Sequence, residues 1–263
     1  MLALANKSKG WSREQLLVAY SLYTRLRFGQ FDQRNAEVIA FAALIGRSPS
    51  ALAMKLGNIA SLDPVITSSG RSGLTGASAA DRAMWQELQD DWSAFSLQMA
   101  QTVAVLQPQS EPLVWPEVHD FPVPNYSSTT KESVVQVRIG QAYFRNAVLS
   151  AYNNRCCITG LTVPKLLIAS HIVPWSEDVK HRLNPQNGLA LSALHDKAFD
   201  LGMLTIDEQY RVVVSAKLKL HRDEFFQAAI QSVHGKKMFM PEKFSPNTEF
   251  LALHRDTIFE KRF

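Results

Sequence analysis

The sequence predicts an α+β protein built from two different parts. Apolar residues recur at three- and four-residue intervals through most of residues 12–106, which is typical of packed helices. Within 129–263, short strand-like runs alternate with turn residues and shorter helical patterns. Residues 107–128 contain five prolines and no periodicity, which indicates an extended linker. We therefore expect a helical domain over 1–106 and a mixed domain over 129–263.

The bulk composition narrows the class of protein. Hydrophobic residues make up 46% and charged residues 20% of the 263 residues, as in ordinary globular proteins. The net charge of +4 and the pI of about 9.1 suit a polyanionic partner. Only Cys156 and Cys157 are present, too few for a disulfide framework or a four-cysteine zinc site. No stretch resembles a secretory signal or a membrane span, so we expect a cytoplasmic protein without membrane contact.

The first helices have recognisable starts. SREQ at 12–15 matches a capping box, in which Ser12 caps a helix and Gln15 reaches back to it. A second helix is expected over 35–45, with Gly46 as its C-cap. The third begins at Ser48, with Pro49 at the first helical position. Two helices joined by a short glycine turn predict a helix-turn-helix unit.

This unit carries candidate contacts to nucleic acid. Arg47, Ser48 and Lys55 lie at or near the start of its second helix, where N–H groups and basic side chains can meet phosphates. The alternative is an all-helical packing or oligomerisation domain, because few side chains of this helix could read bases. Further along, 67–80 is rich in Gly and Ser and predicts a loop. A single long helix is then expected over 78–106.

The second part predicts short elements in quick succession. A helix is expected at its start, two hairpins flank a short helix, and a last helix follows. The expected ranges are a helix over 141–152, a hairpin of 157–160 with 166–172, a helix over 192–200, a hairpin of 202–206 with 211–215, and a helix over 222–233.

The stretch 166–207 carries the residue types that phosphodiester hydrolysis requires. His171 ends an apolar strand, and a neutral histidine is a good base near pH 7. Asn187 lies in an Asn-Gly turn, where its amide or backbone carbonyl can orient the imidazole. Asp196 and Asp200 are four residues apart on a helix, so both carboxylates can share a hard cation. The adjacent histidine, His195, is an alternative ligand.

Four sequence blocks in order then carry a family resemblance. They are C-x-x-[TS]-G, A-S-H-I-x-P-W, N-P-x-N-G-L-x-L and H-D-x-A-F-D-x-G. Over about 140–215 the chain resembles the HNH endonucleases, which have the ββα-metal fold. The resemblance implies that His171 is the general base and Asn187 the middle residue of the motif. Its third position falls on His195 or on Asp196; the nine-residue gap from Asn187 to Asp196 is the commoner one in the family.

The resemblance also implies a divalent metal. Asp196 and Asp200 occupy the positions of the usual H-x3-[HN] pair, so we favour them as ligands, with His195 close behind. An oxygen-rich ligand set favours Mg²⁺ or Mn²⁺ over Zn²⁺. Many relatives carry an acidic residue or a histidine where this chain has Ser170, so a carboxylate ligand must come from elsewhere. The paired CxxC knuckles of many relatives are also missing, and we expect no structural zinc.

The resemblance points to metal-dependent cleavage of double-stranded DNA, in restriction or anti-phage defence. His181 and Arg182 are further candidates for phosphate contact, although we favour their interpretation as solvated loop residues. Cutting both strands with one site per chain favours a homodimer. Two rival interpretations stay open. One is a non-catalytic DNA-binding or regulatory protein with a decayed site, which Ser170 supports, and the other is a nuclease toxin or homing-type enzyme.

Overall fold

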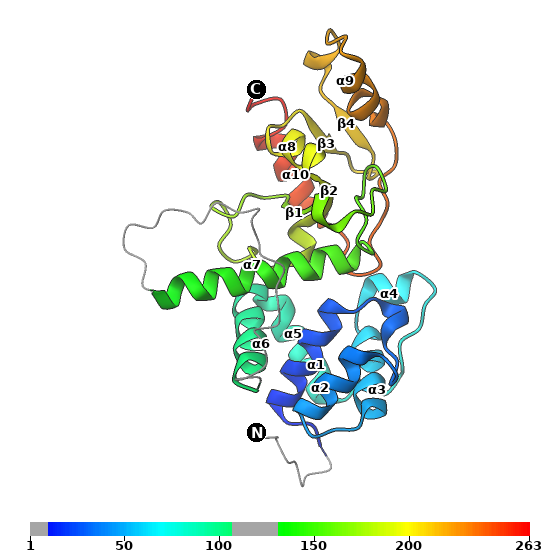
Figure 1. The fold of residues 1–263 in the computed structure, drawn as a ribbon, viewed down its shortest axis with the longest axis vertical. Helices are drawn as coiled ribbons and strands as arrows, with labels where there is room; N and C mark the ends of the chain where they lie inside the picture. The colour runs from blue at the N-terminus through cyan, green and yellow to red at the C-terminus, as the bar shows by residue number, and fades with distance from the viewer. Residues whose placement is uncertain (1–9, 107–130) are drawn as a thin grey trace.

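Six helices build the N-terminal half of the described chain. The computed structural model describes residues 10–106 and 131–263. The six helices fill the lower half of the molecule in Figure 1. They are α1 (Arg13–Arg25), α2 (Ala36–Leu44), α3 (Pro49–Ala60), α4 (Pro64–Ser68), α5 (Ala79–Asp90) and α6 (Trp92–Leu106).

Local caps begin the first three helices, and those at Ser12 and Ser48 were expected. Ser12 accepts from the backbone of Gln15 and the side chain of Gln15 accepts in return, which completes the capping box of α1. The Asn35 side chain caps α2, and Ser48 caps α3. Gly46 between them has a φ of 63°, a conformation that favours glycine. The axes of α2 and α3 differ by 102°, within the range of about 90–120° for helix-turn-helix pairs.

The single helix expected over 78–106 is wrong, because the chain breaks between α5 and α6. Asp91 leaves the helical conformation, with φ −150° and ψ 88°. Its carboxylate accepts a hydrogen bond from the backbone N–H of Ala94 at 2.9 Å. An aspartate that bonds the backbone ahead of it competes with helix continuation and favours a cap. The apolar spacing continues across the break and therefore hides it.

The C-terminal half contains one long helix, two small antiparallel sheets and three shorter helices within the described residues. In chain order they are α7 (Lys131–Ala151), β1 (Leu167–His171), β2 (Gly188–Ser192), α8 (Ala193–Asp200), β3 (Leu204–Ile206), β4 (Val212–Val214), α9 (Glu224–Ala229) and α10 (Thr248–Thr257). The α+β fold class is confirmed. The helix expected from 141 begins ten residues earlier, the one expected over 222–233 is shorter, and α10 was not expected.

The first expected hairpin is wrong in its pairing. Residues 157–160 form a turn, and β1 pairs antiparallel with β2 instead. All five residues of β2 are buried, so the strand lacks the alternation that marks a half-exposed strand. The second hairpin is confirmed as β3 paired with β4. The order β1, β2, α8 is the ββα unit on which the candidate site lies, and Ser192 caps α8 directly after β2.

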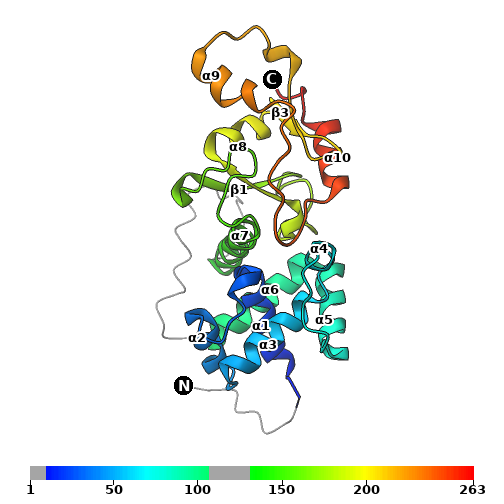
Figure 2. The same ribbon diagram turned by 90° about the vertical axis from the view of Figure 1, so that its right-hand side faces the viewer.

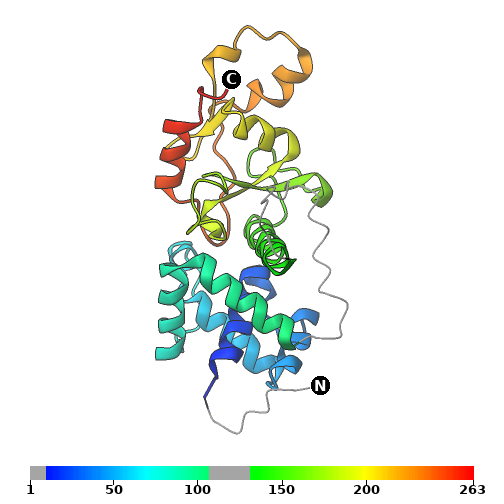
Figure 3. The ribbon, with the colours of Figure 1, turned by 90° about the vertical axis from the view of Figure 1, so that its left-hand side faces the viewer.

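Helix α7 lies between the two halves of the molecule (Figures 1, 2 and 3). It packs against α1 and α6 on one side and against β1 and β2 on the other. The Ser150 hydroxyl donates to the Thr24 carbonyl at 2.8 Å. The buried Lys243 ammonium donates to the carbonyls of Tyr23 at 2.5 Å and Leu26 at 2.6 Å. The halves thus share a continuous core. The linker expected over 107–128 lies outside the described residues.

Taken singly, none of the described helices is both long and apolar enough to cross a bilayer. Only together do α2 and α3, which are bent by 102° relative to each other, reach the length and apolar composition of a span within the described residues.

Candidate active site

The end of β1 and the start of β2 bring His171 against α7. His171 lies opposite Gly188 in the strand pair. A Cβ at Gly188 would lie 2.3 Å from Cγ2 of Val148 and 2.9 Å from Cζ of Phe144. The glycine therefore allows α7 to approach the strands closely. As a result the Phe144 ring stacks on the imidazole of His171, with centroids 3.9 Å apart and planes 8° apart.

The hydrogen bond of His171 defines its tautomer. Nε2 lies 2.9 Å from the carbonyl oxygen of Arg182. Because a carbonyl only accepts, Nε2 carries the hydrogen, and the lone pair of the neutral ring belongs to Nδ1. The pKa of His171 is lowered to about 4, chiefly by burial; the hydrogen bond to the Arg182 carbonyl opposes this shift, and the positive charge of Arg182 adds to it. The imidazole is therefore neutral near pH 7, as a general base must be.

Asn187 braces the loop that carries this carbonyl. Its Oδ1 accepts from the N–H of Val173 at 2.8 Å, and its Nδ2 donates to the Val173 carbonyl at 3.1 Å. A longer bond of 3.4 Å reaches the carbonyl of His181. The Arg182 carbonyl thus orients the imidazole through Nε2, and the Asn187 side chain bonds the loop that leads to that carbonyl. Buried amide bonds of this kind position the loop, and through it His171.

His171, Asp196 and Asp200 line one cavity of about 640 Å³. Asp196 and Asp200 come from the same side of α8, as their four-residue spacing predicts. Burial raises the pKa of Asp200, while the positive charges of Lys197 and Arg262 lower it. The remaining wall comes from β1, the following loop, α8 and the chain end. Its residues are Ile168, Ser170, Pro174, Trp175, Lys197, Leu201 and Arg262.

The donor set of this cavity fits a hard divalent cation. Two carboxylates from one helix are a common anchor for Mg²⁺, which completes its coordination with water and substrate phosphate. Within the described residues, Ser170 Oγ and Trp175 Nε1 are buried without a hydrogen-bond partner in the wall of the cavity. Such atoms indicate that a polar ligand or water fits there. In the same part of the chain, no three His, Cys, Asp or Glu residues form a complete protein cage for a metal.

His195 does not line the cavity. Its Nε2–H donates to the carbonyl of Ala229 at 3.0 Å, and its Nδ1 lies 2.7 Å from Ser192 Oγ, which therefore donates. Burial lowers the pKa of His195, although the carbonyl of Ala229 opposes the shift. Nε2 thus ties α8 to the end of α9, whereas Nδ1 bonds the cap residue of α8 itself. Of the two alternatives for the third motif position, the structure brings Asp196 to the cavity and leaves His195 in a packing role.

The loop after β1 carries the other two candidates. His181 Nδ1 lies 2.6 Å from the Asp178 carboxylate, so this imidazole is already paired. The Arg182 Nε–H donates to the Trp175 carbonyl at 2.7 Å, and its guanidinium lies 5.3 Å from the centre of the Trp175 ring. Trp175 in turn meets the His171 ring edge-on. Arg182 thus lies beside the cavity wall, although it is not itself part of the wall.

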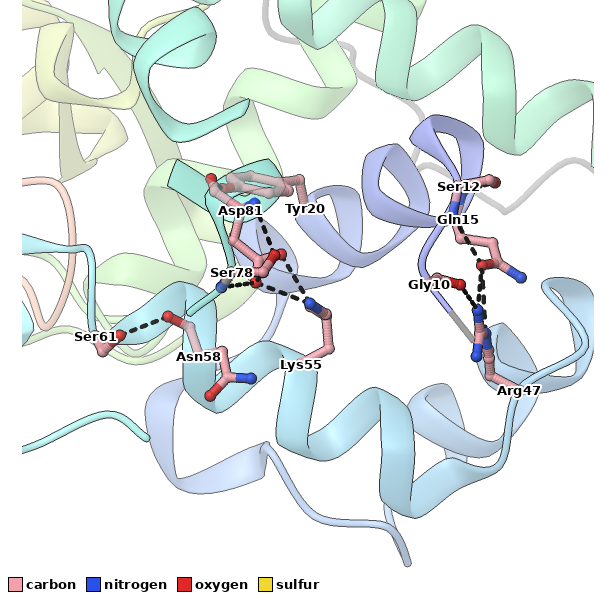
Figure 4. A network of polar contacts seen from close by, with 10 residues as sticks. All are labelled: Gly10, Ser12, Gln15, Tyr20, Arg47, Lys55, Asn58, Ser61, Ser78 and Asp81. Atoms are coloured by element: carbon pink, nitrogen blue, oxygen red, sulfur yellow. Dashed lines mark hydrogen bonds and ion pairs between the residues drawn. The ribbon is translucent and has the colours of Figure 1, made fainter. Parts of the chain in front are cut away.

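Lys55 is buried in the helical half, and its expected contact with phosphate is wrong. Its ammonium lies 2.8 Å from both carboxylate oxygens of the buried Asp81, as Figure 4 shows. The helix periodicity could not reveal this pairing, because the partner comes from α5.

Arg47 and Ser48 are held by local bonds. Arg47 donates to Gln15 Oε1 at 3.0 Å and to the carbonyl of Gly10 (Figure 4). Ser48 Oγ accepts from the N–H of Ala51 at 3.2 Å as the cap of α3. Both side chains therefore have structural roles that do not require DNA.

The two cysteines are both free and buried. The backbone N–H of Cys157 donates to the carbonyl of Ala190, which joins this turn to β2. Both therefore act as small apolar residues of the core.

Comparisons with known proteins agree with the ββα unit. Residues 156–207 match the HNH_2 family model, described as HNH endonuclease, so the resemblance is confirmed for this segment. Among solved structures, the modification dependent TagI restriction endonuclease is similar at 16% sequence identity and a TM-score of 0.32. The similarity covers 46% of this chain and 40% of that chain, less than two thirds of its length. No curated protein matches the chain.

Proposed function

We propose that this protein is a metal-dependent DNA endonuclease whose active centre is the cavity between β1 and α8. The observation that carries the proposal is the meeting of His171, Asp196 and Asp200 at one cavity within the HNH-like segment. Double-stranded DNA is the expected substrate. Cleavage is expected to leave a 5′-phosphate and a 3′-hydroxyl.

In this proposal His171 acts as the general base. Its Nδ1 takes a proton from a water molecule, whose oxygen attacks phosphorus as the bond to O3′ breaks. The released O3′ takes up a proton from solvent and becomes the 3′-hydroxyl. The Arg182 carbonyl keeps the hydrogen on Nε2 and stabilises the imidazolium once the proton has arrived. The flat stack on Phe144 fixes the ring plane. Asn187 contributes indirectly, by holding the loop.

Asp196 and Asp200 would hold the cation, with Mg²⁺ or Mn²⁺ preferred over Zn²⁺. When bound, such a cation stabilises the negative charge on the phosphate oxygens and on the leaving O3′. Ser170 offers a hydroxyl in place of the charged group found in many HNH relatives. The two aspartates therefore supply the negative charge for the cation.

The biological setting that we propose is restriction or anti-phage defence in the cytoplasm. The helical half would then act as the recognition or sensing part, and a homodimer would place one site on each DNA strand. The shared core along α7 supports a recognition role for the helical half, since it gives the two halves of the chain a defined orientation.

Plasmid cleavage tests the proposed function. Supercoiled and linear DNA are incubated with wild type and with His171→Ala in Mg²⁺, in Mn²⁺ and in EDTA. Cleavage by wild type only, and only with metal, is expected. No cleavage under any condition would favour a non-catalytic DNA-binding protein, whereas equal cleavage by both proteins would refute the role of His171. A panel of modified and unmodified DNAs identifies the preferred substrate, and killing on expression would instead indicate a toxin.

A further inference from the structure

The wall of the cavity includes a cation from the far end of the chain. Arg262 lines the same cavity as His171, Asp196 and Asp200, although it lies 62 residues beyond Asp200 in the sequence. Its Nη1 donates to the backbone carbonyl of Asp200 at 3.4 Å. Its Nη2 lies 3.2 Å from the carboxylate of Glu177, on the loop after β1. The guanidinium thus bridges the end of α8 and that loop at the wall of the cavity.

The chain end is fastened in place by several bonds. The N–H of Glu260 donates to the carbonyl of Gly202 at 3.0 Å, and the Glu260 carboxylate accepts from Ser215 Oγ at 2.5 Å. Lys217 donates to the Glu260 carbonyl at 2.6 Å. A Cβ at Gly202 would lie 2.2 Å from the Ile258 carbonyl oxygen, so the glycine permits this close approach. Arg262 is therefore presented by an ordered segment.

The ion pair with Glu177 is suited to exchange. The side chains of Arg262 and Glu177 are 40% and 46% exposed. Exposed pairs of this kind contribute little to stability. A phosphate accepts two parallel N–H bonds from a guanidinium and carries a full charge, so it competes well with one carboxylate oxygen. The negative charges of the two aspartates repel the DNA phosphates, and a nearby positive charge offsets this repulsion.

We propose that Arg262 binds a DNA phosphate at or next to the bond that is cut, and that Glu177 holds the guanidinium ready until DNA arrives. This assignment rests on the proposed nuclease function and adds a phosphate-binding residue that is remote in sequence from the HNH-like segment. Lys197 is the other basic side chain in the described wall of the cavity.

The test uses full-length protein with Arg262→Gln, Arg262→Lys, Glu177→Gln and the control Lys261→Gln. Lys261 is the adjacent residue and its ammonium donates to the carbonyl of Asp256, so its replacement removes the same charge outside the cavity. Binding of a labelled duplex is measured in EDTA over a range of salt concentrations. Cleavage kinetics are measured separately in Mg²⁺ and Mn²⁺.

Loss of one phosphate contact lowers the slope of log K against log salt by about 1. We expect this change for Arg262→Gln but not for Lys261→Gln, together with a fall of about tenfold or more in kcat/KM, since a charge-assisted contact is lost. Arg262→Lys should retain part of the slope. Glu177→Gln should bind DNA at least as tightly as wild type, because a competitor for the guanidinium has gone.

Two results would overturn the assignment. One is an unchanged salt slope in Arg262→Gln, with or without a loss of rate. The other is equal weakening by Arg262→Gln and Glu177→Gln, which would mean that the ion pair only supports the fold. Absence of cleavage by wild type would refute the nuclease function instead, and the salt slope would still report on Arg262.

Discussion

Replacing Gly188 with alanine should disturb both the fold and the site, because one methyl group has no room. The new Cβ would lie 2.3 Å from Val148 Cγ2, 2.9 Å from Phe144 Cζ and 3.1 Å from the Pro185 carbonyl oxygen. Val148 is β-branched and sits in α7, so its side chain has little rotamer freedom. Phe144 is held against His171 by stacking. Relief therefore requires that α7 and the strands move apart.

Overpacking of this kind costs about 1–3 kcal/mol. For a chain of this size each kcal/mol lowers Tm by roughly 2–4 °C. Because the displaced ring is the one that stacks on His171, cleavage should fall further than the loss of folded protein explains. The assays are thermal unfolding and cleavage kinetics at a temperature where the variant is folded.

Two companion variants make the reasoning refutable. Gly29→Ala is the matched control, since nothing lies within 4 Å of a Cβ there. Val148→Ala alone leaves a cavity and destabilises the protein. In the Gly188→Ala background it removes the clashing methyl, so the double variant should lose less stability than the sum of the two single variants. Wild-type Tm and activity in Gly188→Ala, or simple additivity in the double variant, would contradict the packing described.

Three further predictions concern the charged groups. Asp196→Asn and Asp200→Asn should each raise the Mn²⁺ concentration required for half-maximal cleavage by at least about tenfold. A metal titration of cleavage measures this concentration, and titration curves identical to that of wild type would exclude the two residues as ligands. Lys55→Met should destabilise the protein by about 3–5 kcal/mol in denaturant unfolding, because Asp81 is left buried and uncompensated, while DNA affinity stays at the wild-type value. The ring of His171 should lose its proton as pH rises through about 4 and stay neutral above that pH. The chemical shifts of its ring in metal-free protein should therefore not change between pH 5.5 and 8. A titration midpoint near pH 6.5 would contradict the burial described.

The local caps and the order of the chemical residues are readable from the sequence. Ser12, Asn35 and Ser48 each bond a backbone N–H two or three residues ahead, so a few letters contain the whole signal. The spacing of Asp196 and Asp200 similarly predicts that they share one side of a helix. The break at Asp91 was equally local but was hidden by a continuing apolar pattern.

The tertiary structure alone decided which groups meet. Gly188 reads as a turn residue in the sequence, yet its importance comes from the side chains of α7. Lys55 reads as a free cation, but Asp81 on another helix buries and pairs it. The His171 ring bonds the carbonyl of Arg182, and Arg262 reaches the cavity from a segment remote in sequence. The physical reason is the separation of the contacting residues along the sequence. A cap involves neighbours along one backbone, whereas these contacts form only when separate elements pack together.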